Sequence, residues 1–191
     1  MQYPSTIPGR APLALQIPSN TFADADDWRE HRKSGGVVID VRTNEIVLDG
    51  LSMPHSPQWY RNGLWLLDSG SGYLDKTHGT FERVAFCPDY ARGLSFIDDY
   101  AVIGLSRPRH NKTFSGLQLD DNLVAKKAEP RSGLIVINLQ TGDTVHSLTI
   151  TGIIEELFDV VALQGVQMSM AIGFQNDEIR RMISIETDEP L

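Results

Sequence analysis

The chain has 191 residues, of which 41% are hydrophobic and 22% charged, a composition typical of a soluble globular protein with one domain. Its formal net charge of −8 argues against a general nucleic-acid binder, because such a protein needs a basic face to meet phosphates. No run approaches the roughly 18 apolar residues of a membrane span, and no signal peptide is evident. A single cysteine excludes an internal disulfide and a cysteine-based zinc site, so we expect a cytoplasmic protein.

Residues 1–35 are predicted to form a proline-rich arm and a short helix. The arm holds four prolines, and proline fits neither a helix interior nor a central strand. Leu13, Leu15 and Ile17 alternate as one face of a strand would. The arm is therefore either a floppy terminus or a segment that lies on a neighbouring surface. The helix is expected over residues 21–33.

A hairpin over residues 36–48 opens a single β domain that is expected to run to residue 186, followed by a tail over residues 187–191. The hairpin consists of a β-branched strand, a turn and a returning strand. The same pattern appears again at residues 133–148. The separation of the two copies fits two repeating units of roughly 45 to 50 residues each. Units of this length are typical of β-propeller blades.

Counting strands gives about three four-stranded blades. Complete units are expected at residues 55–86 and 91–150. Residues 157–174 would supply the two inner strands of a further unit, and the hairpin at 36–48 its two outer strands. Short strands in fours, repeated radially, predict an all-β, β-propeller-like fold. A β-sandwich is the alternative, because it too is built from short strands.

Three blades are too few to close a propeller, which typically has at least four. We therefore expect a homodimer, in which two copies of three blades complete a ring of six. The hairpin at residues 36–48 of one chain would pair with residues 157–174 of the other. Residues 181–186 alternate like a further strand and would compete for that edge. The alternative is a monomeric partial barrel or sandwich.

Five motifs between residues 36 and 175 are moderately specific. They are residues 52–57 (SMPHSP), 64–70 (LWLLDSG), 91–94 (ARGL), 104–109 (GLSRPR) and 156–160 (ELFDV). Together they resemble an uncharacterised bacterial family of conserved hypothetical proteins, whose members can be joined to tetratricopeptide repeats. The resemblance implies a propeller-like fold and no assigned activity, and the chain is similar to a shortened member.

No recognised catalytic motif is present, so candidate site residues rest on their positions in the predicted strands. His55 lies between two prolines near the start of an inner-type strand, where propellers place ligands. A neutral imidazole there could bind a metal or move a proton. Asp68 ends an apolar strand and is a second candidate ligand. The alternatives are a structural histidine and a turn-capping aspartate.

A basic cluster lies beside a long predicted insertion over residues 107–131. Arg107 and Arg109 open the insertion, and Arg92 lies in the same predicted unit. The planar fork of arginine suits oxyanions, so this cluster predicts a site for a phosphate, a carboxylate or an acidic sugar. The alternative is a solvated loop whose bases offset local acid.

Glu155 and Asp159 are candidate ligands of a divalent cation, as in sugar-lactonase-like propellers, and a solvated acidic corner is the alternative. No other cofactor is evident. Two function classes stay open. The first is a ligand-binding or protein-assembly module without chemistry, for an anionic small molecule or for a protein partner. The second is a metal-assisted hydrolase of the sugar-lactonase type, with His55 and Asp68 as further ligands. The absence of a catalytic motif favours the first class.

Overall fold

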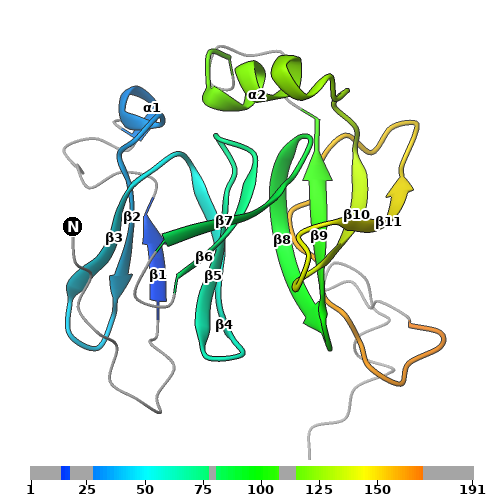
Figure 1. The fold of residues 1–191 in the computed structure, drawn as a ribbon, viewed down its shortest axis with the longest axis horizontal. Coiled ribbons are helices and arrows are strands. Elements are labelled where there is room, and N and C mark those ends of the chain that lie inside the picture. The colour runs from blue at the N-terminus through cyan, green and yellow to red at the C-terminus, as the bar shows by residue number, and fades with distance from the viewer. Residues whose placement is uncertain (1–13, 18–27, 78–80, 108–114, 170–191) are drawn as a thin grey trace, which may run out of the picture.

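The computed structural model describes residues 14–17, 28–77, 81–107 and 115–169. These residues form eleven strands and two helices, and the strands make three antiparallel sheets. The expected all-β class is therefore confirmed. Figure 1 shows the three sheets side by side, in the order in which the chain forms them.

The first sheet contains β1 (Ala14–Ile17), β2 (Gly36–Asp40) and β3 (Glu45–Leu51), in that order. The expected hairpin is β2 and β3. Of the three alternating residues in the arm, Leu15 and Ile17 lie on β1, which pairs antiparallel with β2 along its whole length, and Leu13 lies outside the described residues. The first sheet thus extends N-terminally of residue 36, where we placed the domain boundary.

Two four-stranded sheets follow, and in each the strands lie side by side in chain order. Their strands are β4 (Pro54–Tyr60), β5 (Gly63–Asp68), β6 (Tyr73–Thr77) and β7 (Phe81–Phe86), then β8 (Tyr90–Ile97), β9 (Tyr100–Ser106), β10 (Gly133–Asn138) and β11 (Thr144–Thr149). Both expected four-strand units are therefore present. The turn between β4 and β5 places Arg61 and Asn62 at φ 46° and 61°, which matches the natural twist of a hairpin.

The second sheet is packed on both faces, which explains why β5 is apolar from Leu64 to Leu67. Leu64 and Leu66 pack against Val38 and Leu48 of the first sheet. The opposite face belongs to the largest core cluster, whose members are Trp65, Leu67, Leu74, Ala85, Cys87, Ala91, Leu94, Ala101, Ile103, Leu105, Ile135 and Ile137. Each large apolar side chain buried in this way stabilises the fold by about 1.5 to 3 kcal/mol.

Helix α1 (Trp28–His31) lies within the helix expected over residues 21–33, and residues 21–27 lie outside the described residues. Helix α2 (Gln118–Lys126) lies in the insertion between β9 and β10, where we expected no regular element. Its buried Leu119 and Leu123 are four residues apart, so they share one helix face that packs on the sheets. Neither described helix has the length and hydrophobicity needed to span a bilayer.

The prediction of a strand from residue 157 onward is wrong for residues 157–169, because residues 151–169 contain no strand or helix. Residues 170–174 and 181–186 lie outside the described residues. The expected pairing of the first hairpin with a second chain also needs correction, because β1 of the same chain occupies that edge of β2. Within the described ranges no closed barrel forms, and the sheets instead stack face to face.

Candidate functional site

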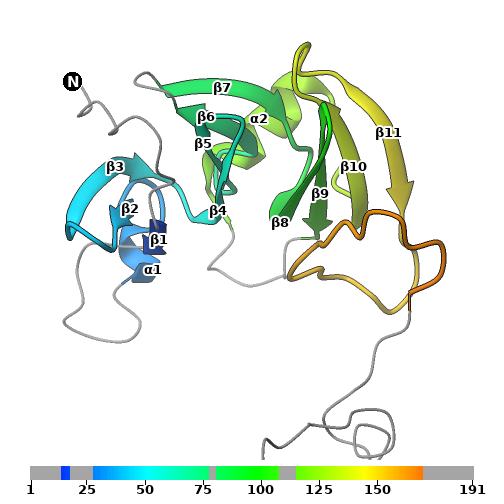
Figure 2. The ribbon, with the colours of Figure 1, turned by 90° about the horizontal axis from the view of Figure 1, so that it is seen from below.

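Residues 155–162, which we call the strap, run along the face of the third sheet that points away from the core. Figure 2 shows the chain turning back from β11 toward β8 and β9 in this region. The hydroxyl of Ser106 on β9 donates to the carbonyl of Leu157 and accepts from its amide. Further along, the amide of Ala162 donates to Ser95 Oγ on β8. These serine hydroxyls, together with a backbone hydrogen bond from Arg107 to Glu155, thus hold the strap against the sheet.

Two glycines allow the strap to approach the sheet. A Cβ at Gly93, whose φ is +74°, would lie 2.4 Å from the amide nitrogen of Val160. A Cβ at Gly104 would lie 2.4 Å from the carbonyl of Arg92 and 3.0 Å from a methyl group of Val160. Any other residue at Gly93 would therefore collide with the strap and strain the backbone. Two of the five sequence motifs owe their glycines to this contact.

His55 and Arg92 are brought close enough to interact. Burial first, and the charge of Arg92 second, lower the pKa of His55 to about 4, so its imidazole is neutral at physiological pH. The guanidinium of Arg92 lies 3.9 Å from the carboxylate of Glu156 and over the ring of Phe158. Arg92 is therefore engaged by the strap, although its predicted role as an anion ligand stays a prediction.

Asp68 is buried at the end of β5 and anchors the turn that follows. One of its oxygens accepts the amide of Ser52 at 2.6 Å, and the other accepts the hydroxyl of Ser71. Burial raises its pKa, while these two hydrogen bonds and the charge of Arg83 oppose the increase. These contacts are the ones a turn-capping aspartate makes, and the role of Asp68 as a ligand stays a prediction.

Glu155 and Asp159 are exposed on the strap. Asp159 accepts a hydrogen bond from the amide of Val160, and the carbonyl of Glu155 accepts from the amide of Arg107 and from Ser132 Oγ. In the part of the chain that the structure describes, no three His, Cys, Asp or Glu side chains gather as a metal site would require. The two predicted metal ligands therefore have no third partner there.

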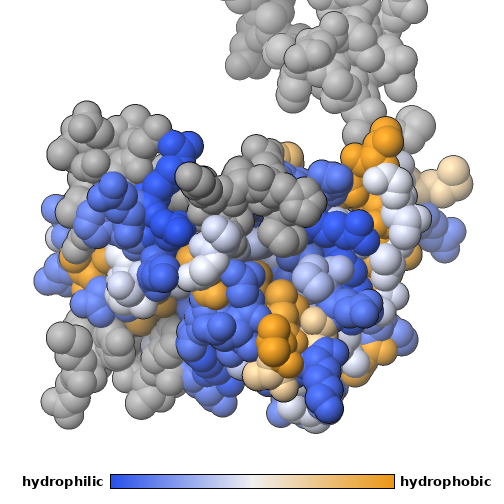
Figure 3. Space-filling view, turned by 90° about the horizontal axis from the view of Figure 1, so that it is seen from above, coloured by the Kyte–Doolittle hydropathy of each residue, from blue (hydrophilic) through white to orange (hydrophobic). Residues whose placement is uncertain are grey.

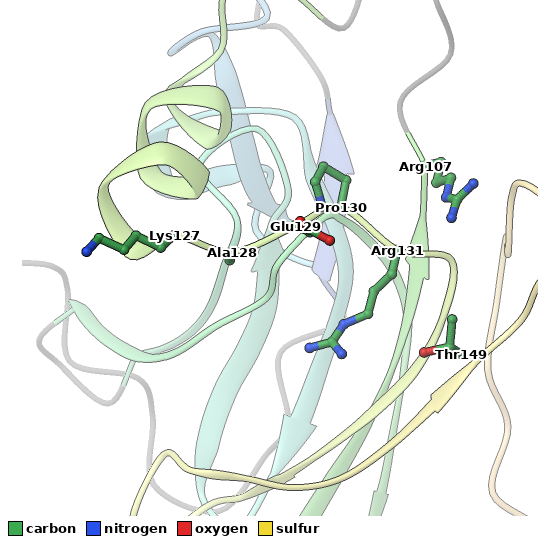
Figure 4. Close-up of a pocket in the computed structure, with 7 residues that line it drawn as sticks. All are labelled: Arg107, Lys127, Ala128, Glu129, Pro130, Arg131 and Thr149. Carbon is green, nitrogen blue, oxygen red and sulfur yellow. The ribbon is translucent and has the colours of Figure 1, made fainter.

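Arg107 follows β9 and lines a pocket of about 440 Å³, which we call the basic pocket (Figure 4). Its other lining residues are Lys127, Ala128, Glu129, Pro130, Arg131 and Thr149. Arg92 does not line it, so the structure places the predicted arginines Arg92 and Arg107 in different surroundings. Arg109 lies outside the described residues.

The end of α2 creates the basic pocket. Lys127 adopts a left-handed conformation at φ 51°, and the amide of Ala128 donates to the carbonyl of Leu123 as the helix ends. The chain then passes through Pro130 and Arg131 into β10. The pocket therefore lies between the helix end, the entry to β10 and the ends of β9 and β11.

The charges of the basic pocket are unbalanced. It presents three cations and a single carboxylate, that of Glu129. Among the described residues, no ion pair involves Arg107, Lys127 or Arg131. Sequence reasoning singled out Arg107 but missed the other two, because it did not foresee the helix that places them. The only available signal was the basic residues at the end of the insertion.

Asp89, which precedes β8, is a buried carboxylate that sequence reasoning also missed. Its Oδ1 accepts the amide of Tyr90 at 2.8 Å. Burial raises the pKa of Asp89 to about 7. Hydrogen bonds from the backbone of Tyr90 and Arg131, and the charge of Arg107, lower this pKa and so oppose the increase. Two residues of the basic pocket, Arg107 and Arg131, thus influence the pKa of Asp89, although Asp89 does not line the pocket.

A family profile described as Domain of unknown function (DUF4915) matches residues 17–172. The match covers the second and third sheets, the strap and the basic pocket, and it confirms the expected membership in an uncharacterised family. No curated protein matches the chain.

Proposed function

The chain belongs to the family described as Domain of unknown function (DUF4915), and we propose that it is a binding module for a small anionic ligand. The ligand lies in the basic pocket, where Arg107, Lys127 and Arg131 bind it. The observation that carries this proposal is the gathering of three cations and one carboxylate around a pocket on a chain of net charge −8. Cations left without ion pairs at a pocket favour an oxyanion as their partner.

The spacing of the cations indicates the kind of anion. In Figure 4, Arg131 lies between Lys127 on one side and Arg107 and Thr149 on the other. The cations are thus spread along the pocket and do not surround one point. This arrangement favours a ligand with two anionic groups over a single small ion.

The finer architecture is also a proposal, namely that the sheets are propeller-like blades. In the second and third sheets the strands follow one another in chain order, as in a blade. The first strands of the three sheets also lie beside one another, β1 against β4 and β4 against β8. Blades that meet along their first strands support the propeller-like reading over a two-sheet sandwich. The cytoplasm stays our proposed location.

A second candidate function is assembly with a second copy of the chain. Large apolar side chains are exposed on the strap and beside it, at Ile153, Phe158, Val161, Leu163 and Met168. Figure 3 shows hydrophobic surface on the side of the molecule that carries the third sheet. Apolar surface of this kind marks interaction sites. The metal-assisted hydrolase, in contrast, draws no support from the described residues.

Thermal unfolding in the presence of anions tests the binding proposal. Ethane-1,2-disulfonate carries two permanent charges, and sulfate serves as a single-group comparison. At about ten times its dissociation constant, a ligand of the native state raises the midpoint of unfolding by a few degrees, on the order of 2–4 °C. We expect this increase for the disulfonate and a smaller one for sulfate at equal concentration and ionic strength.

Two variants show whether the basic pocket is responsible. Arg131→Ala should abolish most of the increase, because Arg131 is the central cation. Arg42→Ala is the matched control, since it removes an arginine of the first sheet that is 53% exposed and pairs with Asp40. Equal increases in wild type and Arg131→Ala, or no increase at all, would show that the basic pocket does not bind anions.

A further inference from the structure

Asp89 is a buried carboxylate beside the basic pocket that the proposed anion site leaves without a role. Its side chain is fully buried, and its Oδ2 has no hydrogen-bond partner within the described chain. Burial of the carboxylate, with one oxygen left without a hydrogen-bond partner, makes its ionised form costly, so the neutral form is favoured. Asp89 therefore gains or loses its proton near neutral pH, where ordinary aspartates are ionised.

Asp89 lies next to the basic pocket, because Tyr90 pairs with Ser106 across β8 and β9 and the antiparallel register therefore brings Asp89 beside Arg107. The charge of Arg107 and the backbone of Arg131 both favour the ionised form of Asp89. An ionised Asp89 must in turn reduce the positive potential that Arg107 offers to a ligand, since the same interaction acts in both directions. When Asp89 is protonated, that potential is restored.

The other charged groups around Asp89 do not duplicate this effect. Tyr90 is buried next to Asp89. Its pKa is raised by burial first, and then by the negative charges of Asp120 and Asp89, so its phenol stays neutral near pH 7. Arg32 acts on Tyr90 with the opposite sign. Glu129 is the carboxylate of the pocket itself, and no histidine lines the pocket.

We propose that the basic pocket couples anion binding to proton uptake, in which Asp89 becomes protonated at Oδ2 more often as the anion enters. This inference rests on the proposed anion site and adds its regulation by pH. A bound anion near Arg107 makes ionisation of Asp89 less favourable, so the proton is held more tightly in the complex. Affinity is therefore highest below about pH 7 and falls as the pH rises above it.

Isothermal titration calorimetry with ethane-1,2-disulfonate tests the proposal on the full chain. The charge of this probe does not change near neutral pH, so any pH dependence comes from the protein. We expect binding about threefold to tenfold tighter near pH 6 than near pH 8, at constant ionic strength. Titrations in two buffers of different ionisation enthalpy, near pH 7.5, should show uptake of a fraction of a proton per ligand.

Three variants separate Asp89 from other carboxylates. Asp89→Asn should bind with the same affinity at every pH, close to the wild-type value near pH 6. Glu129→Gln should bind more tightly than wild type yet keep the pH dependence, because it removes a carboxylate of the pocket itself. Asp49→Asn, which neutralises an exposed residue of β3, should behave as wild type.

The outcomes distinguish this inference from the function on which it rests. Binding of the disulfonate with no proton uptake and no pH dependence overturns the role of Asp89 and leaves the anion site standing. Absence of binding at every pH overturns the anion site and this inference with it. If Asp89→Asn does not fold, the proton count for the wild-type chain decides alone.

Discussion

The hydroxyl of Ser106 and the backbone of Leu157 form two hydrogen bonds with each other, both 2.9 Å long. They fasten the strap to the third sheet, and Ser106 is buried beneath it. Ser106→Ala leaves the partly buried amide and carbonyl of Leu157 without this partner. We expect a loss of about 1–3 kcal/mol in the free energy of unfolding, measured by urea denaturation. Ser147→Ala, on the exposed strand β11, should change it little, and equal losses in the two variants would contradict this account of the strap.

The close approach at Gly93 gives a second prediction. Gly93→Ala introduces a Cβ at 2.4 Å from the amide nitrogen of Val160, in addition to the cost of its positive φ. Gly50 is a matched control, because its φ is +72° and nothing lies within 4 Å of its Cβ position. We expect Gly50→Ala to cost about 1 kcal/mol, and Gly93→Ala at least about 2 kcal/mol more. Similar values for the two would mean that the strap does not lie on the sheet as described.

Asp75 on β6 predicts a dependence of stability on pH. Its side chain is fully buried, and neither carboxylate oxygen has a hydrogen-bond partner among the described residues. Burial first, then the charge of Asp68, raises its pKa to about 8, and Arg83 opposes the increase. The folded chain holds this proton more tightly than the unfolded chain. The contribution of Asp75 to the free energy of unfolding is therefore greatest below about pH 4. It then falls as the pH rises to about 8.

Asp75→Asn tests this dependence. The amide cannot ionise, so the variant should lose much of the decrease in stability between about pH 5 and pH 8, and should exceed wild type near pH 8. Asp89 titrates in the same range and leaves a residual slope. Asp49→Asn provides an exposed control. Parallel stability curves for Asp75→Asn and wild type would show that Asp75 is ionised in the folded chain.

Self-assembly is tested by light scattering on a sizing column. Phe158 and Val161 are 69% and 70% exposed on the strap, and we expect them to be covered by a second copy of the chain. The double substitution Phe158→Asp with Val161→Asp should therefore convert a dimer to a monomer at micromolar concentration. Val124→Asp is the matched control, since Val124 is 80% exposed on α2, away from the strap. A wild-type chain that runs as a monodisperse monomer would rule out this assembly.

The order of the strands was predictable because each strand carries its own local signal. The β5 strand is apolar without interruption from Leu64 to Leu67, as expected of a strand packed on both faces. The turn at Arg61 and Asn62 follows from residues that tolerate or require positive φ before Gly63. Local patterns of this kind located both four-stranded sheets, whose strands are neighbours in sequence.

The strap was not predictable for a related reason. Leu157 and Val160 do pack on the third sheet, although the segment is not the strand that their apolar character predicted. The hydrogen bonds from the strap to the sheet, however, join Leu157 to Ser106 and Ala162 to Ser95, and the distance between the segments depends on glycines of other strands. No local pattern in residues 155–162 distinguishes a strap held by side chains from a strand held by backbone.

The basic pocket was half predictable. Arg107 attracted attention as part of a basic cluster beside a long insertion. Arg131 and Lys127 join it because α2 folds back on the sheets. In the sequence, little more than the spacing of Leu119 and Leu123 indicates that helix. Asp89 gives no signal in the sequence, because its burial and its proximity to Arg107 arise from the packing of the whole domain.

The central claim is that the basic pocket binds an anion, and crystals of the chain soaked in selenate test it most directly. Selenate is a dianion, and the anomalous scattering of selenium locates it without reference to the protein. We expect a selenium peak within hydrogen-bonding distance of the Arg131 side chain, and its loss in crystals of Arg131→Ala. Selenium found only at other exposed arginines, such as Arg42 and Arg61, with none in the basic pocket, would contradict the account.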